Sequence, residues 1–251
     1  MTNLAVEKKL TRRHLFKFSG RLAGMTAFAF SGLGLGHAGT KTYALTPTTT
    51  EGPYFVDEKL KRSDIRETED GQLVVLTIRV MGLDSDGQPV ALPNAQVDIW
   101  HCNADGDYSD VKNNSANTCG ETFLRGYQVT NKRGVVRFKT IFPGWYTGRT
   151  VHIHCNVRTF DNSGAVDSEH QTQIFFTEAL IEKVYEAEPY LTRAARRDQF
   201  NDTDGILNGV SDPSVLIAKA SYDEDRVTAS IRLFVNSDDA GHTAKTSTTC
   251  G

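Results

Sequence analysis

Short runs in which apolar and polar residues alternate recur along most of the chain. Alternation with a period of two is typical of a β-strand with one buried face, and β-branched residues favour it further. The pattern predicts strands at 73–80, 95–100, 123–129, 135–140, 151–157, 171–176, 214–222 and 226–235. A helical pattern is clear only at 178–186, where it ends near Pro189, and a second short helix is expected within 191–200.

The segments between these runs carry turn signals and little periodicity. Residues 84–88 read DSDGQ, and residues 130–134 end in Asn-Lys-Arg-Gly, which favours a hairpin between the flanking strands. Residues 45–53 are expected to form an extended arm, and the charged residues 59–71 a surface loop. Many short strands without alternating helices favour an all-β β-sandwich with short helices in its connections, which spans 45–235 as one domain.

The first 44 residues differ from the rest of the chain. A basic start is followed by a Gly- and Ala-rich apolar stretch, and Arg12 and Arg13 with the nearby Phe16 and Lys17 resemble a twin-arginine signal. A basic amphipathic helix is the alternative. We therefore expect 1–44 to direct export to the periplasm or the medium, in the folded state and with any cofactor already inserted. The polar residues 236–251 are expected to form a C-terminal tail.

Charge narrows the class of partners. The whole chain carries a net charge of −3, and residues 1–44 hold seven cationic residues and one acid, so removing them leaves a net charge near −9. An acidic surface without a basic patch argues against nucleic acid and anionic membranes as partners. No second long apolar run follows the export signal, so no membrane insertion is expected after its removal.

The four cysteines are Cys102, Cys119, Cys155 and Cys250. An even number in an exported protein permits disulfides, and four cysteines allow three full pairings. Cys102 and Cys119 bracket a loop, which makes them one candidate pair, and buried thiols are the alternative.

The residues with the clearest chemical potential lie between 142 and 158. His152 and His154 are two apart on a predicted strand, so their side chains point to the same face and could bind one metal ion. A pair of structural histidines is the alternative. The turn at Pro143–Gly144 would aim Tyr146 back toward the histidines, and Arg149 lies between.

A second segment, 92–111, ends a predicted strand near Trp100 and presents Tyr108 on a loop rich in Gly, Asp and Asn. On its own, Tyr108 would be a half-buried packing residue. Together, the ordered motifs P-N-A-x-V-x-x-W, G-x-Y-S, L-R-G, G-x-V-x-F-x-T, P-G-x-Y, R-x-x-H-x-H and T-Q-I resemble the intradiol ring-cleaving dioxygenases. The resemblance covers roughly residues 45–235, and T-E-G-P-Y at 50–54 with G-W-Y-x-G-R at 144–149 is similar to the exported branch of that family.

The resemblance implies a mononuclear ferric ion, Fe(3+), bound by Tyr108, Tyr146, His152 and His154. Phenolate is a hard anionic donor that favours Fe(III), and imidazole suits iron. In the family, a catechol-type diol and O2 give a cis,cis-muconate-type diacid that contains both oxygen atoms, without an external reductant. Tyr146 matches the tyrosine that leaves the metal and takes up a substrate proton, whereas Tyr108 matches the one that stays bound.

The resemblance assigns further residues around this centre. Arg149 matches an arginine that lines the substrate site, with a strand-end salt bridge as the alternative, and Gln173 matches a glutamine near the same pocket. Tyr54 and Trp145 are expected to be either apolar walls of the site or core packing. Five residues separate Tyr146 from His152, fewer than in the best-known members, so the substrate is not carried over. Three further histidines match no ligand position and are expected to be structural or surface residues: His101, His170 and His242.

Two other classes of protein compete with this interpretation. A non-catalytic exported β-sandwich that binds aromatics or metal would have lost one or more ligand positions, whereas all four are filled. A zinc or copper hydrolase or oxidase could use His152 and His154, but two tyrosines in place of Cys, Asp or a third His argue against zinc. An oligomer is compatible with every one of these interpretations.

Overall fold

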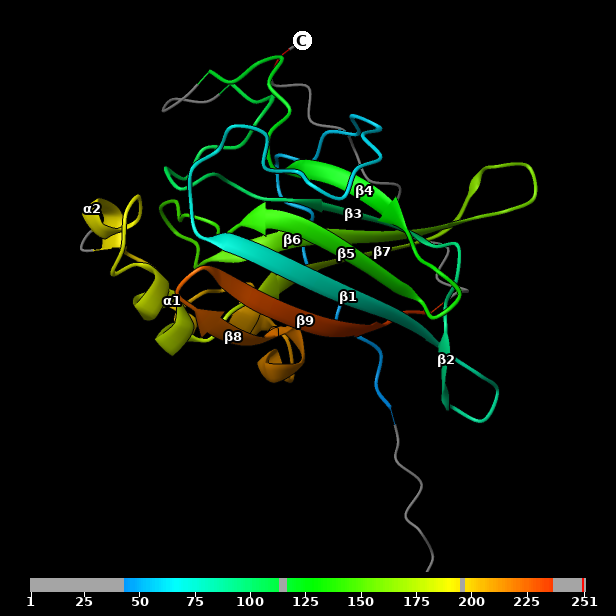
Figure 1. Ribbon diagram of the computed structural model, residues 1–251. Coiled ribbons are helices and arrows are strands. Elements are labelled where there is room, and N and C mark those ends of the chain that lie inside the picture. The colour runs from blue at the N-terminus through cyan, green and yellow to red at the C-terminus, as the bar shows by residue number, and fades with distance from the viewer. Residues whose placement is uncertain (1–42, 113–116, 195–196, 237–249, 251) are drawn as a thin grey trace, which may run out of the picture. The chain divides into compact units, whose positions relative to one another are not determined.

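The computed structural model describes residues 43–112, 117–194, 197–236 and 250. The expected export signal and most of the expected C-terminal tail therefore lie outside the described residues. Two β-sheets dominate the described part of the chain (Figure 1), and short helices occur in the connections. No helix in these ranges is long and apolar enough to cross a membrane.

The first sheet is built around β1 (Leu73–Leu83). β5 (Val135–Ile141) pairs with it in the antiparallel direction, and β9 (Arg226–Phe234) pairs with it in the parallel direction. The short β2 (Pro89–Ala91) pairs with the end of β1, and β8 (Lys219–Asp223) forms an antiparallel pair with β9.

The second sheet has four antiparallel strands in the order β4–β3–β6–β7. They are β4 (Arg125–Val129), β3 (Gln96–Trp100), β6 (His152–Phe160) and β7 (Val166–Phe175). The helices follow β7: α1 (Glu178–Val184), α2 (Leu191–Ala194), and the 3₁₀ helices η1 (Leu207–Gly209) and η2 (Pro213–Leu216). Thr177 caps α1 by accepting a hydrogen bond from the Leu180 N–H.

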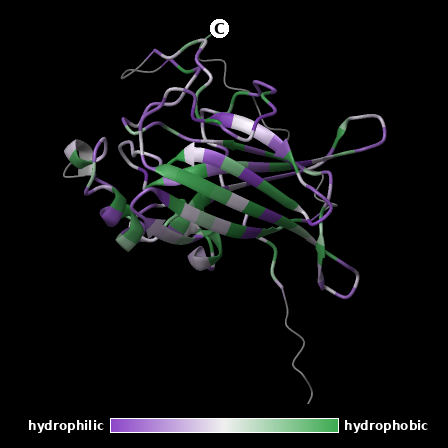
Figure 2. Cartoon of the chain, in the orientation of Figure 1, coloured by the Kyte–Doolittle hydropathy of each residue, from purple (hydrophilic) through white to green (hydrophobic). Residues whose placement is uncertain are grey.

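The hydrophobic core lies between the inner faces of the two sheets. β1 contributes alternate residues such as Leu76 and Ile78, β5 contributes Phe138, and β3 and β6 contribute Ile99 and Ile153, all at most 1% exposed. Figure 2 shows β1 as largely hydrophobic and β5 and β9 with hydrophilic residues interspersed, whereas many of the loops are hydrophilic. The β-sandwich, each of the predicted strand regions from 73 to 176, and the helix at 178 are confirmed.

Two predictions about connections are wrong. Residues 130–134 do not form a hairpin, because β4 pairs with β3 in one sheet while β5 pairs with β1 in the other. The chain instead crosses from sheet to sheet at this turn. The predicted strand 214–222 begins only at Lys219, since Pro213 starts η2 and Asp212 accepts a hydrogen bond from the Ser214 N–H.

The segment 59–71 is more than a surface loop. Ile65 is completely buried, its N–H donates to the Lys139 carbonyl, and its own carbonyl accepts from the Leu124 N–H. Because the residues around Ile65 are mostly polar or charged, the sequence pattern did not indicate that this one position is buried.

The expected disulfide between Cys102 and Cys119 is not formed. Cys119 is bonded to Cys250, whereas Cys102 and Cys155 are buried thiols that form no disulfide with each other or with the described Cys119 and Cys250. Cys102 follows the end of β3 and packs with Trp100 and Tyr108, whereas Cys119 lies in an exposed part of the loop. The disulfide thus ties the β3–β4 loop to the end of the chain.

Phe138 tests the core between the sheets. Its side chain is 1% exposed, so Phe138→Ala is expected to lower the free energy of unfolding by about 3–5 kcal/mol, through lost burial and the cavity left behind. Arg137→Ala, one position earlier and exposed, should change it by no more than about 0.5 kcal/mol. Urea unfolding of both variants measures the difference, and equal effects would show that β5 faces the core differently.

Candidate functional site

The outer face of the second sheet is polar and yet buried. Along β6 the residues that face the core are apolar, such as Ile153 and Cys155, whereas His152, His154 and Asn156 alternate with them on the other face. All seven residues from 152 to 158 are buried, so both faces of this strand are covered. Polar side chains on a covered face must find partners or a ligand.

The cover is an N-terminal arm, residues 43–62, which has no regular secondary structure along most of its length. Its backbone pairs with β7, where the Thr49 N–H donates to the Gln171 carbonyl at 3.0 Å and Gln173 Nε2 donates to the Thr50 carbonyl at 2.8 Å. Gly52, at φ +76°, lies against His154, because a Cβ there would meet the ring at 3.0 Å. The extended arm predicted at 45–53 is confirmed, and it covers the site.

Four side chains from three segments converge beneath this arm. His152 Nε2 lies 3.1 Å from His154 Nε2, 3.3 Å from the Tyr146 oxygen and 3.5 Å from the Tyr108 oxygen. Tyr108 comes from the β3–β4 loop, Tyr146 from the β5–β6 turn, and both histidines from the start of β6. All four residues singled out from the sequence are therefore in one place, and the Pro143–Gly144 turn aims Tyr146 as expected.

The protonation of the histidines fits a cation at the point of convergence. His152 Nδ1 donates to the Thr150 carbonyl at 2.6 Å, which leaves the Nε2 lone pair directed at the other donors. Burial lowers the pKa of His152 to about 3 and the pKa of His154 well below its usual value, so both rings are neutral. His154 has no hydrogen-bond partner for Nδ1 within the described ranges, and its ring stacks on Trp100 at 4.9 Å and 7°.

The two phenols differ in exposure. Tyr108 is 2% exposed, and burial raises its pKa well above the ordinary value, whereas Tyr146 is only partly buried and burial raises its pKa to about 12. Both are therefore neutral in a site without metal. A multivalent cation would favour the ionisation of both phenols, because its positive charge offsets the cost of burying the negative phenolates. No cluster of three or more His, Cys, Asp and Glu residues that could hold a metal exists among the described residues, so a metal here needs its tyrosine ligands.

A single row of cross-strand neighbours organises the site. Arg125, Trp100, His154 and Gln173 are successive partners across β4, β3, β6 and β7, so all four side chains point to the covered face. Each strand of the sheet thus contributes one residue to the site or its support. A shift of register by one residue in any of them would turn that residue into the core.

Arg125 fastens the loop that carries Tyr108. Its guanidinium donates to Ser109 Oγ at 2.7 Å, to the Ser109 carbonyl, and to the Tyr54 carbonyl of the arm at 2.7 Å. Burial lowers the pKa of Arg125 to about 10, so it remains charged at neutral pH. One buried cation therefore fixes Tyr108 and the arm relative to the same strand.

Arg149 is held from two sides next to the metal donors. Its Nε donates to the Asp204 carboxylate at 2.8 Å, and one terminal nitrogen donates to Gln173 Oε1 at 2.6 Å. Although burial acts to raise the pKa of Asp204, hydrogen bonds from Arg149 and from backbone N–H groups keep it below the ordinary value. The arginine thus makes the salt bridge that was the alternative interpretation, and it also contacts the predicted site residue Gln173.

The other candidates are placed as follows. Tyr54 is partly buried and packs against Tyr108 with ring centroids 4.8 Å apart, whereas Trp145 belongs to the main core. His101 is structural, because its ring bonds the Cys102 carbonyl and the Thr140 hydroxyl, and His170 is buried within β7. His242 lies outside the described residues.

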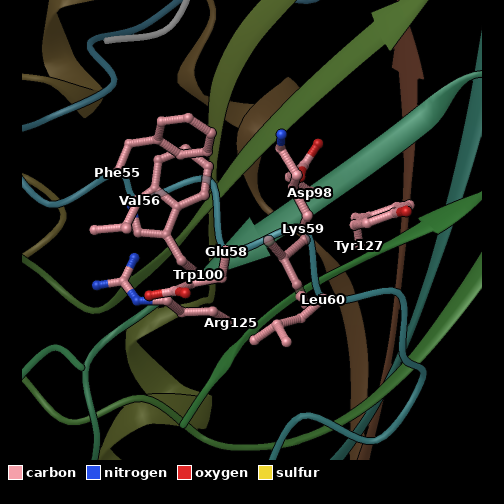
Figure 3. A pocket seen from close by; sticks show the side chains of 11 residues that line it. Phe55, Val56, Glu58, Lys59, Leu60, Asp98, Trp100, Arg125 and Tyr127 are labelled. Carbon is pink, nitrogen blue, oxygen red and sulfur yellow. The ribbon is translucent and has the colours of Figure 1, made fainter. Parts of the chain in front are cut away.

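A crevice between the arm and strands β3 and β4 does not offer a binding site. Figure 3 shows Phe55 and Trp100 with Arg125 and Tyr127 along it, and its volume is only about 10 Å³. This is room for about one water molecule. The arm is thus packed tightly on this side, and the partly exposed Tyr54, Tyr146 and Arg149 mark the more open side of the site.

Sequence reasoning missed three supporting residues. Arg125 lies in the L-R-G motif and Gly52 in T-E-G-P-Y, so both stood within recognised motifs without an assigned role. Asp204 gave no signal, because it lies in a polar loop far from the other site residues in sequence. Its importance follows only from the fold, which places it against Arg149 and the Thr150 N–H.

Comparisons with known proteins agree with this geometry. A family model described as dioxygenase matches residues 50–177, a range that includes all six predicted site residues. The chain is 33% identical over 104 residues to catechol 1,2-dioxygenase of Acinetobacter baylyi, covering 40% of this chain and 32% of that protein. It is also 33% identical over 101 residues to hydroxyquinol 1,2-dioxygenase of Corynebacterium glutamicum, covering 39% and 31%. The match thus spans about a third of the length of these curated relatives.

A solved structure extends the likeness to most of the chain. The intradiol ring-cleavage dioxygenase of Tetranychus urticae superposes with a TM-score of 0.66 and 32% identity, covering 78% of this chain and 96% of that one.

Gly144 tests how the two tyrosine segments are held together. Its N–H donates to the Asn103 carbonyl at 3.0 Å, and a Cβ at this position would collide with the backbone oxygens of Asn103 and Ala104. Gly144→Ala should therefore separate the Tyr108 loop from the Tyr146 turn, lower the affinity for any metal ion held between them at least tenfold, and destabilise the fold by about 1–3 kcal/mol. Metal content after dialysis and urea unfolding measure both effects.

The matched control is Gly209→Ala, where a Cβ meets nothing within 4 Å. If Gly144→Ala bound metal as well as this control, the close approach of the two segments would not be needed for the site.

Proposed function

The chain belongs to the intradiol ring-cleavage dioxygenase family, and we propose that it is an Fe(III)-dependent enzyme that cleaves a catechol-type diol between its two hydroxyl-bearing carbons. The observation that carries this proposal is the convergence of four side chains: the Tyr108 oxygen, the Tyr146 oxygen and His154 Nε2 all lie within 3.5 Å of His152 Nε2. The reaction inserts both atoms of O2 and yields a cis,cis-muconate-type diacid.

The proposed ligands are Tyr108, Tyr146, His152 and His154. Two phenolates and two neutral imidazoles form a hard donor set that favours Fe(III) over softer or divalent ions. When bound, the ion supplies Lewis acidity and activates the diol ring toward O2. The chain's own contribution is to present the four donors already converged, since the arm, Arg125 and the Thr150 carbonyl fix them in place.

The difference in burial between the two tyrosines supports different roles for them. Tyr108 is almost fully buried and held by the Arg125-fastened loop, so it suits a permanent ligand. Tyr146 is partly exposed on the turn after Gly144, next to the open side of the site. We assign to its oxygen the uptake of one proton from the incoming diol, because burial raises the pKa of this phenol to about 12 and it would therefore hold that proton firmly.

Arg149 is assigned to charge stabilisation at the substrate. Its guanidinium is oriented by Asp204 and Gln173. Burial lowers the pKa values of both histidines most, and the positive charge of Arg149 acts in the same direction. A fixed cation in a buried site stabilises negative charge that develops on a bound ring. The named relatives are a catechol 1,2-dioxygenase and a hydroxyquinol 1,2-dioxygenase. We extend to this chain only the feature that these two substrates share, a 1,2-diol on an aromatic ring.

Export is part of the proposal and rests on the twin-arginine-like residues near the start of the sequence.

The alternative functions make different predictions. A non-catalytic β-sandwich would bind an aromatic or a metal without consuming oxygen, and a zinc site would be colourless.

The central test is colour combined with oxygen uptake. The iron-loaded protein should be burgundy-red from phenolate-to-iron charge transfer and should consume O2 with at least one catechol of a panel. Tyr146→Phe should bleach part of this absorption and reduce turnover at least ~100-fold, since it removes a charged ligand at the reacting centre. Tyr222→Phe, in β8 of the other sheet, is the matched control and should keep both. Full colour and activity in Tyr146→Phe would refute its assignment as a ligand, and a red protein inert toward every catechol would refute the catalytic proposal.

Substitution of Arg149 tests charge stabilisation at the substrate separately from metal binding. Arg149→Ala should lower kcat at least ~100-fold while iron content stays within the range of the wild type, because the arginine is not a ligand. Arg149→Lys keeps a positive charge and should recover part of the loss. Steady-state oxygen uptake and iron analysis measure the two effects, and Arg226→Ala, exposed in the β8–β9 hairpin, is the control. Unchanged turnover in Arg149→Ala would contradict the assignment.

A further inference from the structure

A groove on the outer face of the first sheet has no part in the site described above. Its volume is about 590 Å³, and its floor is formed by Thr77 and Arg79 of β1, Ser230 and Arg232 of β9, and Lys219 of β8. The start of the N-terminal arm lies along it, and Val215 of η2 also contributes to its lining. The hydrophobic core separates this face from the metal donors on the other sheet.

The floor of the groove concentrates positive charge. The parallel register of β1 and β9 places Arg79 directly opposite Arg232, about 4.8 Å away along the sheet, and Lys219 is paired with the neighbouring Ser230. No ion pair involves any of these three cations in the part of the chain that the structure describes. Like charges opposite each other on adjacent strands are destabilising, so an anion between them would relieve a cost already present in the fold.

The walls of the groove are apolar. The rings of Tyr43 and Phe234 pack with centroids 5.4 Å apart, and Leu45 and Val215 are exposed at 42% and 40%. An amphipathic ligand could place its acidic group on the arginines and its apolar body on these side chains. The groove volume lies within the range of about 300–1,000 Å³ that is typical of small-molecule sites.

Charge and size exclude two other occupants. A symmetric dimer through this face would bring the same cations of two copies together, which disfavours a second copy of the chain. Three cations in a confined groove on a chain with a net charge of −3 are too few to bind a nucleic-acid backbone.

The sequence predicted no basic patch, and this prediction is wrong at the groove. Residues 79, 219 and 232 are far apart in sequence and become neighbours only when their strands pair in the sheet.

We propose that this groove is a binding site for a small organic anion, with a carboxylate placed between Arg79 and Arg232 and an apolar ring or chain against Leu45, Val215 and Phe234. Guanidinium groups recognise carboxylates through charge-assisted, bidentate hydrogen bonds, and the paired register presents two of them side by side. The site is independent of the metal centre and of the reaction proposed for it.

The test is calorimetric titration of the full chain with benzoate, using benzyl alcohol as its neutral isostere. Benzoate should bind with a stoichiometry of one at the groove, more weakly at high salt, and benzyl alcohol should bind at least tenfold more weakly. The double variant Arg79→Gln/Arg232→Gln should weaken benzoate binding at least tenfold. Its thermal unfolding temperature should not fall, because the substitutions remove a repulsive pair. The single variant Val215→Ala should weaken binding by a smaller factor.

Arg137→Gln is the matched control, because Arg137 is an exposed arginine opposite Thr77 on the same face but does not line the groove. It should bind benzoate within a factor of two of the wild type. A Tyr146→Phe variant with unchanged benzoate affinity would further separate the groove from the metal centre. Equal affinity for benzoate in the wild type and the double variant, equal affinity for benzoate and benzyl alcohol, or no benzoate binding at all would each overturn the proposal.

Discussion

The burial of a polar sheet face is the constraint on which the site depends. An outer face that carries two histidines, an asparagine and an arginine along one strand would ordinarily be left to water. Here the arm covers it, so every polar group on it must be matched by a specific partner. At one end of β6 the match is an ion-pair network, in which Arg158 contacts Asp98 and Asp57. At the other end the imidazoles face two phenols, and a set of donors of this composition suits a cation.

This constraint explains why the supporting residues are as specific as the donors. Arg125 and Asp204 are not expected to touch a metal or substrate, yet each fixes a loop that would otherwise be free to move. Arg125 ties the Tyr108 loop to the arm, and Asp204 orients Arg149 while it accepts the N–H of Thr150, whose carbonyl sets the tautomer of His152. The geometry of the donors is thus determined by buried charges two contacts away from the point of convergence.

Local pattern could predict the elements and most of the site, but not how distant segments meet. The spacing of His152 and His154 on a strand fixes their common face without any knowledge of the fold, and motifs that resemble a known family located Tyr108, Tyr146, Arg149 and Gln173. The 130–134 turn looked like a hairpin because a turn's sequence does not encode which sheet its second strand joins. The partner of Cys119 was likewise beyond reach, since proximity in sequence favoured Cys102 while the fold brings Cys250 to the loop. The basic groove escaped notice for the same reason.

The arm also links the stability of the fold to occupancy of the site. Its contacts with the second sheet include backbone hydrogen bonds to β7, the fit of Gly52 on His154 and the carbonyl held by Arg125, together with the packing of Phe55 on Trp100 and the ion pair of Asp57 with Arg158. The arm and the sheet enclose the site together, so the four side chains are covered only while the arm is docked. A cation that binds only when the four side chains have converged beneath the docked arm would stabilise the docked state by an amount set by its concentration relative to its Kd, through mass action. Docking of the arm and binding of the proposed metal are therefore expected to favour each other.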